Sequence, residues 1–456
     1  MNAKIKLCIS NALFMLICGV MLLSSCSGTD YANAIPASAT ALLRIDASKI
    51  GAENVASVCK MLLPSGDVAN CGLDFSSNVY AFETVDGNFG VCASVKSVGD
   101  LEDFISSLSK QKRCGALRKQ GDFWFSDING SWAIGFSKKA FVVVGPVTAA
   151  SLPDQQRVIA RMLKQDEENS IVSRPIFSKV NEMDGGVNLV AQVQALPEKF
   201  VAPFTIGAPK DADASQVLLA AKIAKENGII TLEGETFSFN ESIEKTLKDS
   251  QKVYRNIVGK YADAISSNSV FCLYTNVDGK TFLPLLQGSK AMQSLLVGLN
   301  TAIDFDNIMR SVDGDFIIQS NGIAADNLNF TMLAQVKKPL WTADVDYWKQ
   351  SCPSGSSISG SKQSGWVYNS GNMKFYFGLD AGGNFYGTSD EELVTGGFNK
   401  AKNVAVSKAI QTKMTGCRLA MMLNLKAISN GVVPGGVMDA MGKLLGGTEA
   451  IIYTIK

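Results

Sequence analysis

The residue with the most specific chemistry is Cys26, because the residues before it have the order of a lipidation signal. Lys4 and Lys6 are followed by the uninterrupted apolar run Ala12–Leu23, which fits the core of a signal peptide and is too short to span a bilayer. Ser24 and Ser25 then supply the small residues that precede a lipidated cysteine, whose thiol is the nucleophile. Ordinary secretion with a chance cysteine is the alternative.

Lipidation anchors a protein without a spanning helix, since each CH₂ group of the acyl chain that is buried in the membrane adds about 0.8 kcal/mol to the binding free energy. We therefore expect a signal peptide over residues 1–25, and a lipidated cysteine with a short tether over residues 26–33. The seven residues after Cys26 reach at most about 25 Å, so the folded body lies close to the membrane. Ser27, which is not acidic, favours the outer membrane, and both its periplasmic and its cell-surface face stay open.

A second group with definite chemistry is a run of cations without an intervening acid, Lys110, Lys112, Arg113, Arg118 and Lys119. Near a membrane, such side chains bind lipid phosphates or anionic glycans, and each charge contributes about 1 kcal/mol to the binding free energy. A solvated connection between a helix and a strand is the alternative interpretation.

Two tryptophans, Trp124 and Trp366, are candidates for stacking on a sugar or on a protein partner. Strand alternation places Phe123 and Phe125 on one face and Trp124 on the opposite face. Core packing on both faces of the strand is the alternative.

The residues that the chain lacks exclude several kinds of catalytic and metal site. Its 456 residues include no histidine, which excludes Ser-His-Asp catalysis, Cys-His catalysis and histidine metal ligands. No Cys-x-x-Cys spacing supports a zinc or redox site. With 43 Lys and Arg against 42 Asp and Glu, the chain also lacks the basic excess of a nucleic-acid binder. We therefore expect no catalytic residue, metal, cofactor or nucleic-acid partner.

A hydrolase of envelope or environmental polysaccharide that works through carboxylates alone is the alternative function. Glycosidases need two carboxylates about 5–10 Å apart, and Asp74 with Asp304 is one candidate pair. Because both residues precede apolar segments, a turn or a helix cap is their simpler role. A carrier of lipid with an enclosed apolar cavity is a third interpretation.

The cysteines beyond the anchor are odd in number, so at least one thiol is unpaired within the chain. Cys59 with Cys71 and Cys92 with Cys114 are the pairs close enough in sequence to be candidate disulfides. Buried apolar packing is the alternative role for these side chains.

Comparison of the chain with itself reveals an internal duplication, with four segments that recur in the same order at offsets between 230 and 241 residues. The pairs are Tyr31–Ile35 with Tyr261–Ile265, Leu73–Phe75 with Ile303–Phe305, Asn88–Lys96 with Asn329–Lys337, and Val193–Leu196 with Leu425–Ile428. We therefore expect a first repeat over residues 34–241 and a second over residues 261–456. An amphipathic helix over residues 242–260, with Asn240 as its N-cap, joins the two.

Both repeats predict the same class of fold. In the first, strands are expected at Thr40–Asp46, Val79–Glu83 and Phe89–Val95, with a helix at Ile50–Leu63 and a tight turn at Asp86-Gly87. Strands that alternate with single helices and tight hairpins predict an α+β protein of two tandem related halves, each a largely antiparallel sheet with packed helices.

Two segments of the first half are Ala34-Ile35-Pro36-Ala37-Ser38-Ala39 and Gly72-Leu73-Asp74-Phe75-Ser76-Ser77. They are similar to a Bacteroidota envelope lipoprotein family that is catalogued only as a domain of unknown function with two internal repeats. The resemblance implies a lipidated, duplicated chain and assigns no catalytic or ligand residue, because its motifs mark strands and turns. The second half departs from it at Ser266, which stands where the first half has Pro36.

These features together predict an outer-membrane-anchored lipoprotein of unknown molecular function. A non-enzymatic binding or assembly module of the cell envelope is the function they favour. Its expected partners are the membrane, through N-terminal acyl chains, and an envelope protein or glycan.

Overall fold

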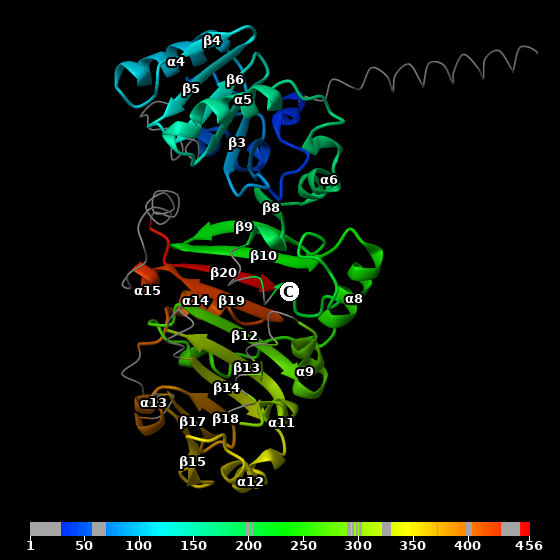
Figure 1. Ribbon diagram of the computed structural model, residues 1–456, viewed down its shortest axis with the longest axis vertical. Coiled ribbons are helices and arrows are strands. Elements are labelled where there is room, and N and C mark those ends of the chain that lie inside the picture. The colour runs from blue at the N-terminus through cyan, green and yellow to red at the C-terminus, as the bar shows by residue number, and fades with distance from the viewer. Residues whose placement is uncertain are drawn as a thin grey trace, which may run out of the picture. The chain divides into compact units, whose positions relative to one another are not determined.

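The computed structural model describes residues 29–56, 70–196, 201, 204–289, 293, 296–297, 300, 303–321, 330–371, 373–396, 404–429 and 447–456. These residues form two compact units, which divide between Glu182 and Met183 (Figure 1). No helix in these ranges is long and apolar enough to cross a membrane. Cys26 and Cys59 lie outside the described residues.

An antiparallel sheet forms the first unit. Its strands, in order across the sheet, are β1 (Ala41–Ile45), β2 (Val79–Glu83), β3 (Phe89–Ser94), β7 (Ala140–Gly145), β6 (Trp132–Phe136), β5 (Phe123–Ile128) and β4 (Arg118–Gln120). Hairpins join β2 to β3 and each strand from β4 to β7 to the next, as the turn residues predict.

Helices cover one face of this sheet. Ile159 of α5 (Leu152–Met162) lies over Gly135 of β6, where a larger residue would collide with it. Tyr31 of the short helix η1 (Asp30–Ala34) and Phe177 of α6 (Pro175–Glu182) both contact the ring of Tyr80 on β2. The first unit also contains η2 (Ala149–Ser151) and η3 (Ile171–Ser173).

The second unit is built on a wider sheet, in which β20 lies between β10 and β19 (Figure 1). Among its described strands only β10 and β20 pair in parallel, and β11 (Tyr254–Arg255) adds a short pairing to β12. The strands across the sheet are β8 (Val187–Gln192), β9 (Leu218–Glu226), β10 (Ile229–Phe237), β20 (Ala450–Ile455), β19 (Leu419–Asn424), β12 (Phe271–Asp278), β13 (Val312–Ser320), β14 (Phe330–Val336), β18 (Phe385–Thr388), β17 (Met373–Leu379), β16 (Gly365–Ser370) and β15 (Ser356–Ser361).

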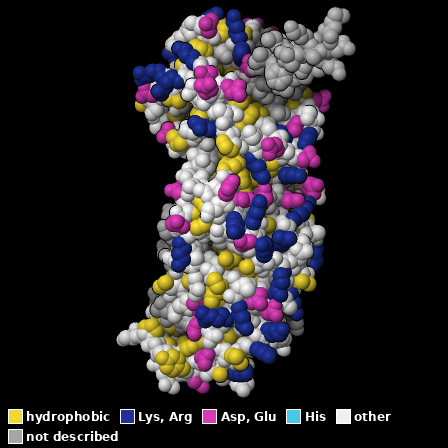
Figure 2. Space-filling model, turned by 90° about the vertical axis from the view of Figure 1, so that its right-hand side faces the viewer, with side chains coloured by type: hydrophobic (Ala, Val, Ile, Leu, Met, Phe, Trp, Pro, Cys, Tyr) yellow, Lys and Arg dark blue, Asp and Glu magenta, His cyan; other side chains and the backbone are white. Residues whose placement is uncertain are grey.

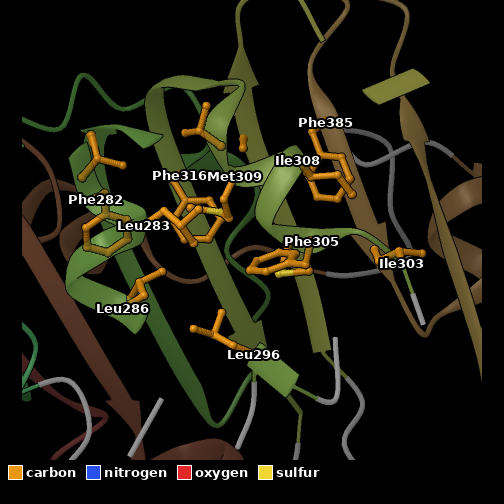
Figure 3. Close-up of a cluster of buried hydrophobic side chains, with 14 of the residues drawn as sticks. Phe282, Leu283, Leu286, Leu296, Ile303, Phe305, Ile308, Met309, Phe316 and Phe385 are labelled. Carbon is orange, nitrogen blue, oxygen red and sulfur yellow. The ribbon is translucent and has the colours of Figure 1, made fainter. Parts of the chain in front are cut away.

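The main core of the second unit lies between this sheet and two helices, α9 (Gly279–Gly288) and α11 (Phe305–Arg310). Figure 3 shows apolar side chains of both helices gathered around Phe316 of β13. The other helices in the described part of the unit are η4 (Val193–Ala195), α8 (Glu241–Gln251), η5 (Ala262–Ala264), η7 (Leu340–Ala343), α12 (Val345–Gln350), α13 (Glu391–Gly396), α14 (Lys408–Lys413) and α15 (Leu425–Ser429).

The sequence predicted the mixed α and β content and the mostly antiparallel pairing of the strands correctly. Two predicted helices differ in extent. Of the helix expected at 50–63, residues 52–56 are helical and residues 57–63 lie outside the described ranges. A separate short helix, α2 (Ala47–Ile50), precedes it and ends at Gly51, whose φ is +83°. The helix expected over 242–260 is α8, which ends at Gln251 because Tyr254 and Arg255 then pair with β12.

Candidate functional site

Five exposed cations form a surface that we call the basic edge: Lys110, Lys112, Arg113, Arg118 and Lys119. Lys110 ends α4 (Val98–Lys110), while Arg118 and Lys119 belong to β4, which pairs only with β5 among the described strands. Figure 2 shows Lys and Arg side chains interspersed with Asp and Glu near the upper end of the first unit. The structure thus places the predicted cations along one edge of the sheet, with Lys112 and Arg113 next to the end of β5 at Ile128 and Lys119 opposite Trp124 near its other end.

The local sequence explains why α4 forms and where it ends. Ser97 caps the helix by accepting a hydrogen bond from the Asp100 N–H, and Leu101, Ile105 and Leu108 form its buried stripe. At the other end the Arg113 N–H donates to the Leu108 carbonyl at 3.0 Å, which is the bond of a Schellman motif.

Lys112 occupies the left-handed position of this helix end, with φ of +59°. Glycine is the usual residue there, because a side chain in the left-handed region costs about 1–2 kcal/mol. The chain therefore retains a lysine at a position where the backbone favours glycine.

The two cations of β4 point to opposite faces of the sheet. Arg118 donates to Gln156 of α5 at 3.2 Å, and the Lys119 ammonium lies 4.6 Å from the centre of the Trp124 ring. On the α5 side, the Lys164 ammonium lies 5.5 Å from the Phe123 ring. Both faces at this edge are therefore positively charged.

The predicted stacking residues are part of the core. Trp124 and Trp366 are each only 4% exposed. The Trp124 ring stacks on Phe136 with 5.3 Å between centroids, and the Trp366 ring lies 5.7 Å from Phe377. Burial therefore overturns the interpretation of these rings as surface stacking groups and supports the core alternative.

The two carboxylates considered for hydrolysis serve local turns. Asp74 accepts hydrogen bonds from the backbone and hydroxyl of Ser76 and from the hydroxyl of Ser77. Burial opposes ionisation of Asp74, but these hydrogen bonds outweigh it and lower the pKa of its carboxyl group. Asp304 caps α11 by accepting from the Asn307 N–H at 3.0 Å. The lowered pKa of Asp74 is the opposite of the raised pKa that a general acid needs.

The described residues contain no group of three or more Cys, Asp or Glu side chains that could hold a metal ion. An acidic hollow of about 480 Å³ is lined by Asp166, Glu167, Glu168 and Ser173. Its oxygens form hydrogen bonds within their own turn, as with Asp166 and the Asn169 N–H at 3.1 Å. The hollow therefore has no feature that identifies a ligand.

Cys92 and Cys114 are both free thiols, so the disulfide proposed between them is absent. Burial raises the pKa of the Cys92 thiol strongly and that of the Cys114 thiol to about 11. The candidate pair of Cys59 with Cys71 includes a residue outside the described ranges. The side chains of Cys92 and Cys114 therefore pack as buried apolar groups.

The sequence did not predict a buried cluster of hydrogen bonds around Asp315 of β13. The Asp315 carboxylate is fully buried and accepts backbone hydrogen bonds from Val258, Gly259 and Lys260 at 2.8–3.0 Å. It also accepts from the Tyr274 hydroxyl at 2.8 Å and from the Asn276 amide at 2.9 Å. Its partners lie 39 to 57 residues away in the chain, so no local pattern marks them.

Comparison with known proteins yields a family but no activity. The family model described as domain of unknown function (DUF4836) matches residues 60–445. No curated protein matches the chain. Two solved structures, crystal forms IV and III of TP0453, are 13% and 14% identical and cover 43% of this chain and 76% of their own, with TM-scores of 0.26 and 0.28. Scores this low carry no conclusion.

Proposed function

Since this chain belongs to the family described as domain of unknown function DUF4836, which carries no assigned activity, we propose its function from its own residues. The protein is a lipoprotein anchored in the outer membrane through acylated Cys26. It acts as a non-enzymatic binding module of the cell envelope. The basic edge of its first unit is the surface that takes an anionic partner, such as the phosphates of lipids or the acidic groups of a glycan.

The observation that carries this proposal is the exposure of all five cations of the basic edge. Cations on an edge strand also prevent pairing with the sheet of another molecule, and this role would explain the presence of Arg118 and Lys119. The same role does not explain the presence of Lys110, Lys112 and Arg113, because these residues precede the strand. Lys112, kept at a strained backbone position, further supports a role in binding, because functional residues are commonly retained at a cost in stability.

The order of strand pairing supports the proposal that the chain is two related repeats. The order β1, β2, β3, β7, β6, β5, β4 recurs as β12, β13, β14, β18, β17, β16, β15. Isolated bridges also correspond, Pro36 with Ser170 and Ser266 with Ala405. The compact units divide at residue 182 rather than at residue 241, because β8, β9 and β10 pair through β20 with the second unit.

The experiment that tests the basic edge is binding of a variant with all five cations changed to Gln. Sedimentation with anionic vesicles and gel shift with an acidic polysaccharide distinguish the two sources of anionic groups. We expect a loss of tenfold or more in affinity for one of the two ligands, since each charge contributes about 1 kcal/mol near an anionic surface. Binding should also weaken as salt rises.

The matched control changes five exposed lysines of the second unit to Gln: Lys222, Lys225, Lys245, Lys362 and Lys374. This variant has the same net charge as the first but keeps the basic edge. Equal losses in both variants, or no binding of either ligand by the unchanged protein, would contradict the proposal.

A further inference from the structure

We infer that one end of the sheet in the first unit faces the bilayer. This end carries the β6–β7 turn, and we call it the anchor end. The opposite end, with the β2–β3 turn, faces away from the membrane. This inference rests on the proposed acylation of Cys26 and adds the orientation of the first unit to it.

The short helix η1 fixes where the anchor joins the folded body. Tyr31 is 3% exposed and its hydroxyl donates to the Asn78 carbonyl at 2.6 Å. The Cys92 thiol in turn donates to the Tyr31 carbonyl at 3.3 Å. Because η1 is packed in this way, only the chain between Cys26 and Asp30 is left as a tether, and it reaches about 14 Å at most.

Asp30 lies at the anchor end. Its carboxylate pairs with the ammonium of Lys139 at 3.0 Å, and Lys139 belongs to the turn between β6 and β7. The Lys139 carbonyl accepts from the Val95 N–H at 3.0 Å, which places the residues after β3 at the same end. The tether therefore holds this end of three adjacent strands near the bilayer.

Charge at the anchor end is close to balanced. Around the β6–β7 turn, three exposed lysines, Lys96, Lys138 and Lys139, are accompanied by three acids, which are Asp30, Asp74 and Asp100. The β4–β5 turn at the same end adds Lys119 and Asp122, one charge of each sign, and Lys164 over the Phe123 ring adds one further cation. The length of the tether rather than electrostatic attraction therefore sets the orientation. Raising the salt concentration should leave the orientation unchanged.

The opposite end of the sheet lies about 20 Å away, the length of the six residues of β3. It carries two exposed apolar side chains, Val85 at 64% and Phe89 at 58%. Cys114 bridges to Ile128 at this same end, so the neighbouring cations Lys112 and Arg113 also lie away from the anchor. Of the basic edge, Lys112 and Arg113 are thus held away from the bilayer, whereas Lys119 lies at the anchor end, because its partner Trp124 pairs with the last residue of β6.

Two labelled variants of the lipidated full chain test the orientation: Lys138→Cys at the anchor end and Asp86→Cys in the β2–β3 turn. Cys352→Ser is added to both, because Cys352 is a partly exposed thiol. Each protein is labelled with a thiol-reactive fluorophore and reconstituted in vesicles whose lipids carry a quencher at the headgroup. We expect quenching at position 138 to be several-fold stronger than at position 86, at low and at high salt.

Equal quenching at the two positions would overturn the orientation. Stronger quenching at position 86 would also overturn it and would indicate that Val85 and Phe89 enter the bilayer. Mass analysis of the same samples separates this failure from that of the proposed anchor. If Cys26 carries no fatty acid, both the anchor and the orientation are wrong; if it is acylated and the quenching is equal, only the orientation is wrong.

Discussion

Asp315 shows at the scale of one residue how much the second unit depends on a single carboxylate. Five donors from two segments of chain, residues 258–260 and strand β12, converge on it. We predict that Asp315→Ala lowers the free energy of unfolding by about 3 kcal/mol or more, because buried donors lose their acceptor. Urea unfolding measures the change. Asp313→Ala is the control, since Asp313 forms surface ion pairs and should cost less than about 1 kcal/mol. Equal losses would contradict this account.

Thiol chemistry gives a second prediction for single residues. Under native conditions at pH 8, an alkylating reagent should label Cys352 and leave Cys92 and Cys272 unmodified, because burial raises the pKa of both buried thiols. Peptide mapping by mass spectrometry reads out the labelled positions, and denatured protein provides the control in which all three react. Labelling of Cys92 in the folded protein would show that its burial is incorrectly assigned.

The same burial makes stability depend on pH. In the folded protein the pKa of Cys114 rises from 9.0 to about 11, so the folded chain holds a proton that the unfolded chain has lost in this window. Stability should therefore fall between about pH 9 and pH 11. Cys114→Ala should reduce that fall, as thermal unfolding at pH 8 and pH 10 would measure. An equal loss of stability with pH in the variant and the unchanged protein would contradict the raised pKa of Cys114.

At the scale of elements, the end of α4 links stability to the basic edge. Lys112→Gly relieves the left-handed strain at the helix end and should raise the free energy of unfolding by about 1 kcal/mol, as chemical denaturation would measure. The same change should weaken binding to the anionic ligand, because it removes one cation. Lys110→Gln is the comparison that removes a cation without altering the helix end. A glycine variant that loses stability would show that the strain is absent.

The sequence predicts the boundary of a helix or strand when the residues that form the boundary are near neighbours in the chain. It does not predict a boundary that depends on contacts with distant residues. The N-cap of α8 was predicted correctly, since Asn240 accepts from the N–H groups of Ser242 and Ile243, which are its near neighbours. The end of α8 was not, because Tyr254 pairs with Val277 across 23 residues. The basic edge was visible as a run of charges, whereas the burial of Trp124 depends on Phe136, a neighbour in the sheet.

For the whole molecule, the last strand ties the C-terminus into the second unit. β20 pairs in parallel with β10 and antiparallel with β19, so it connects two parts of the sheet that are far apart in sequence. Removal of residues 450–456 should therefore unfold the second unit while the first unit keeps its hydrogen-exchange protection. Exchange measured by mass spectrometry on the full and the shortened chain tests this. Retained protection of β19 and β12 would contradict it.

The most direct test of the central proposal is the mass of the mature N-terminal peptide, isolated from the envelope of cells that make the protein. We predict that the mature chain begins at Cys26 and that this residue carries two or three fatty acyl chains. A mature chain that begins elsewhere, or an unmodified Cys26, would contradict membrane anchoring and, with it, the orientation inferred for the first unit.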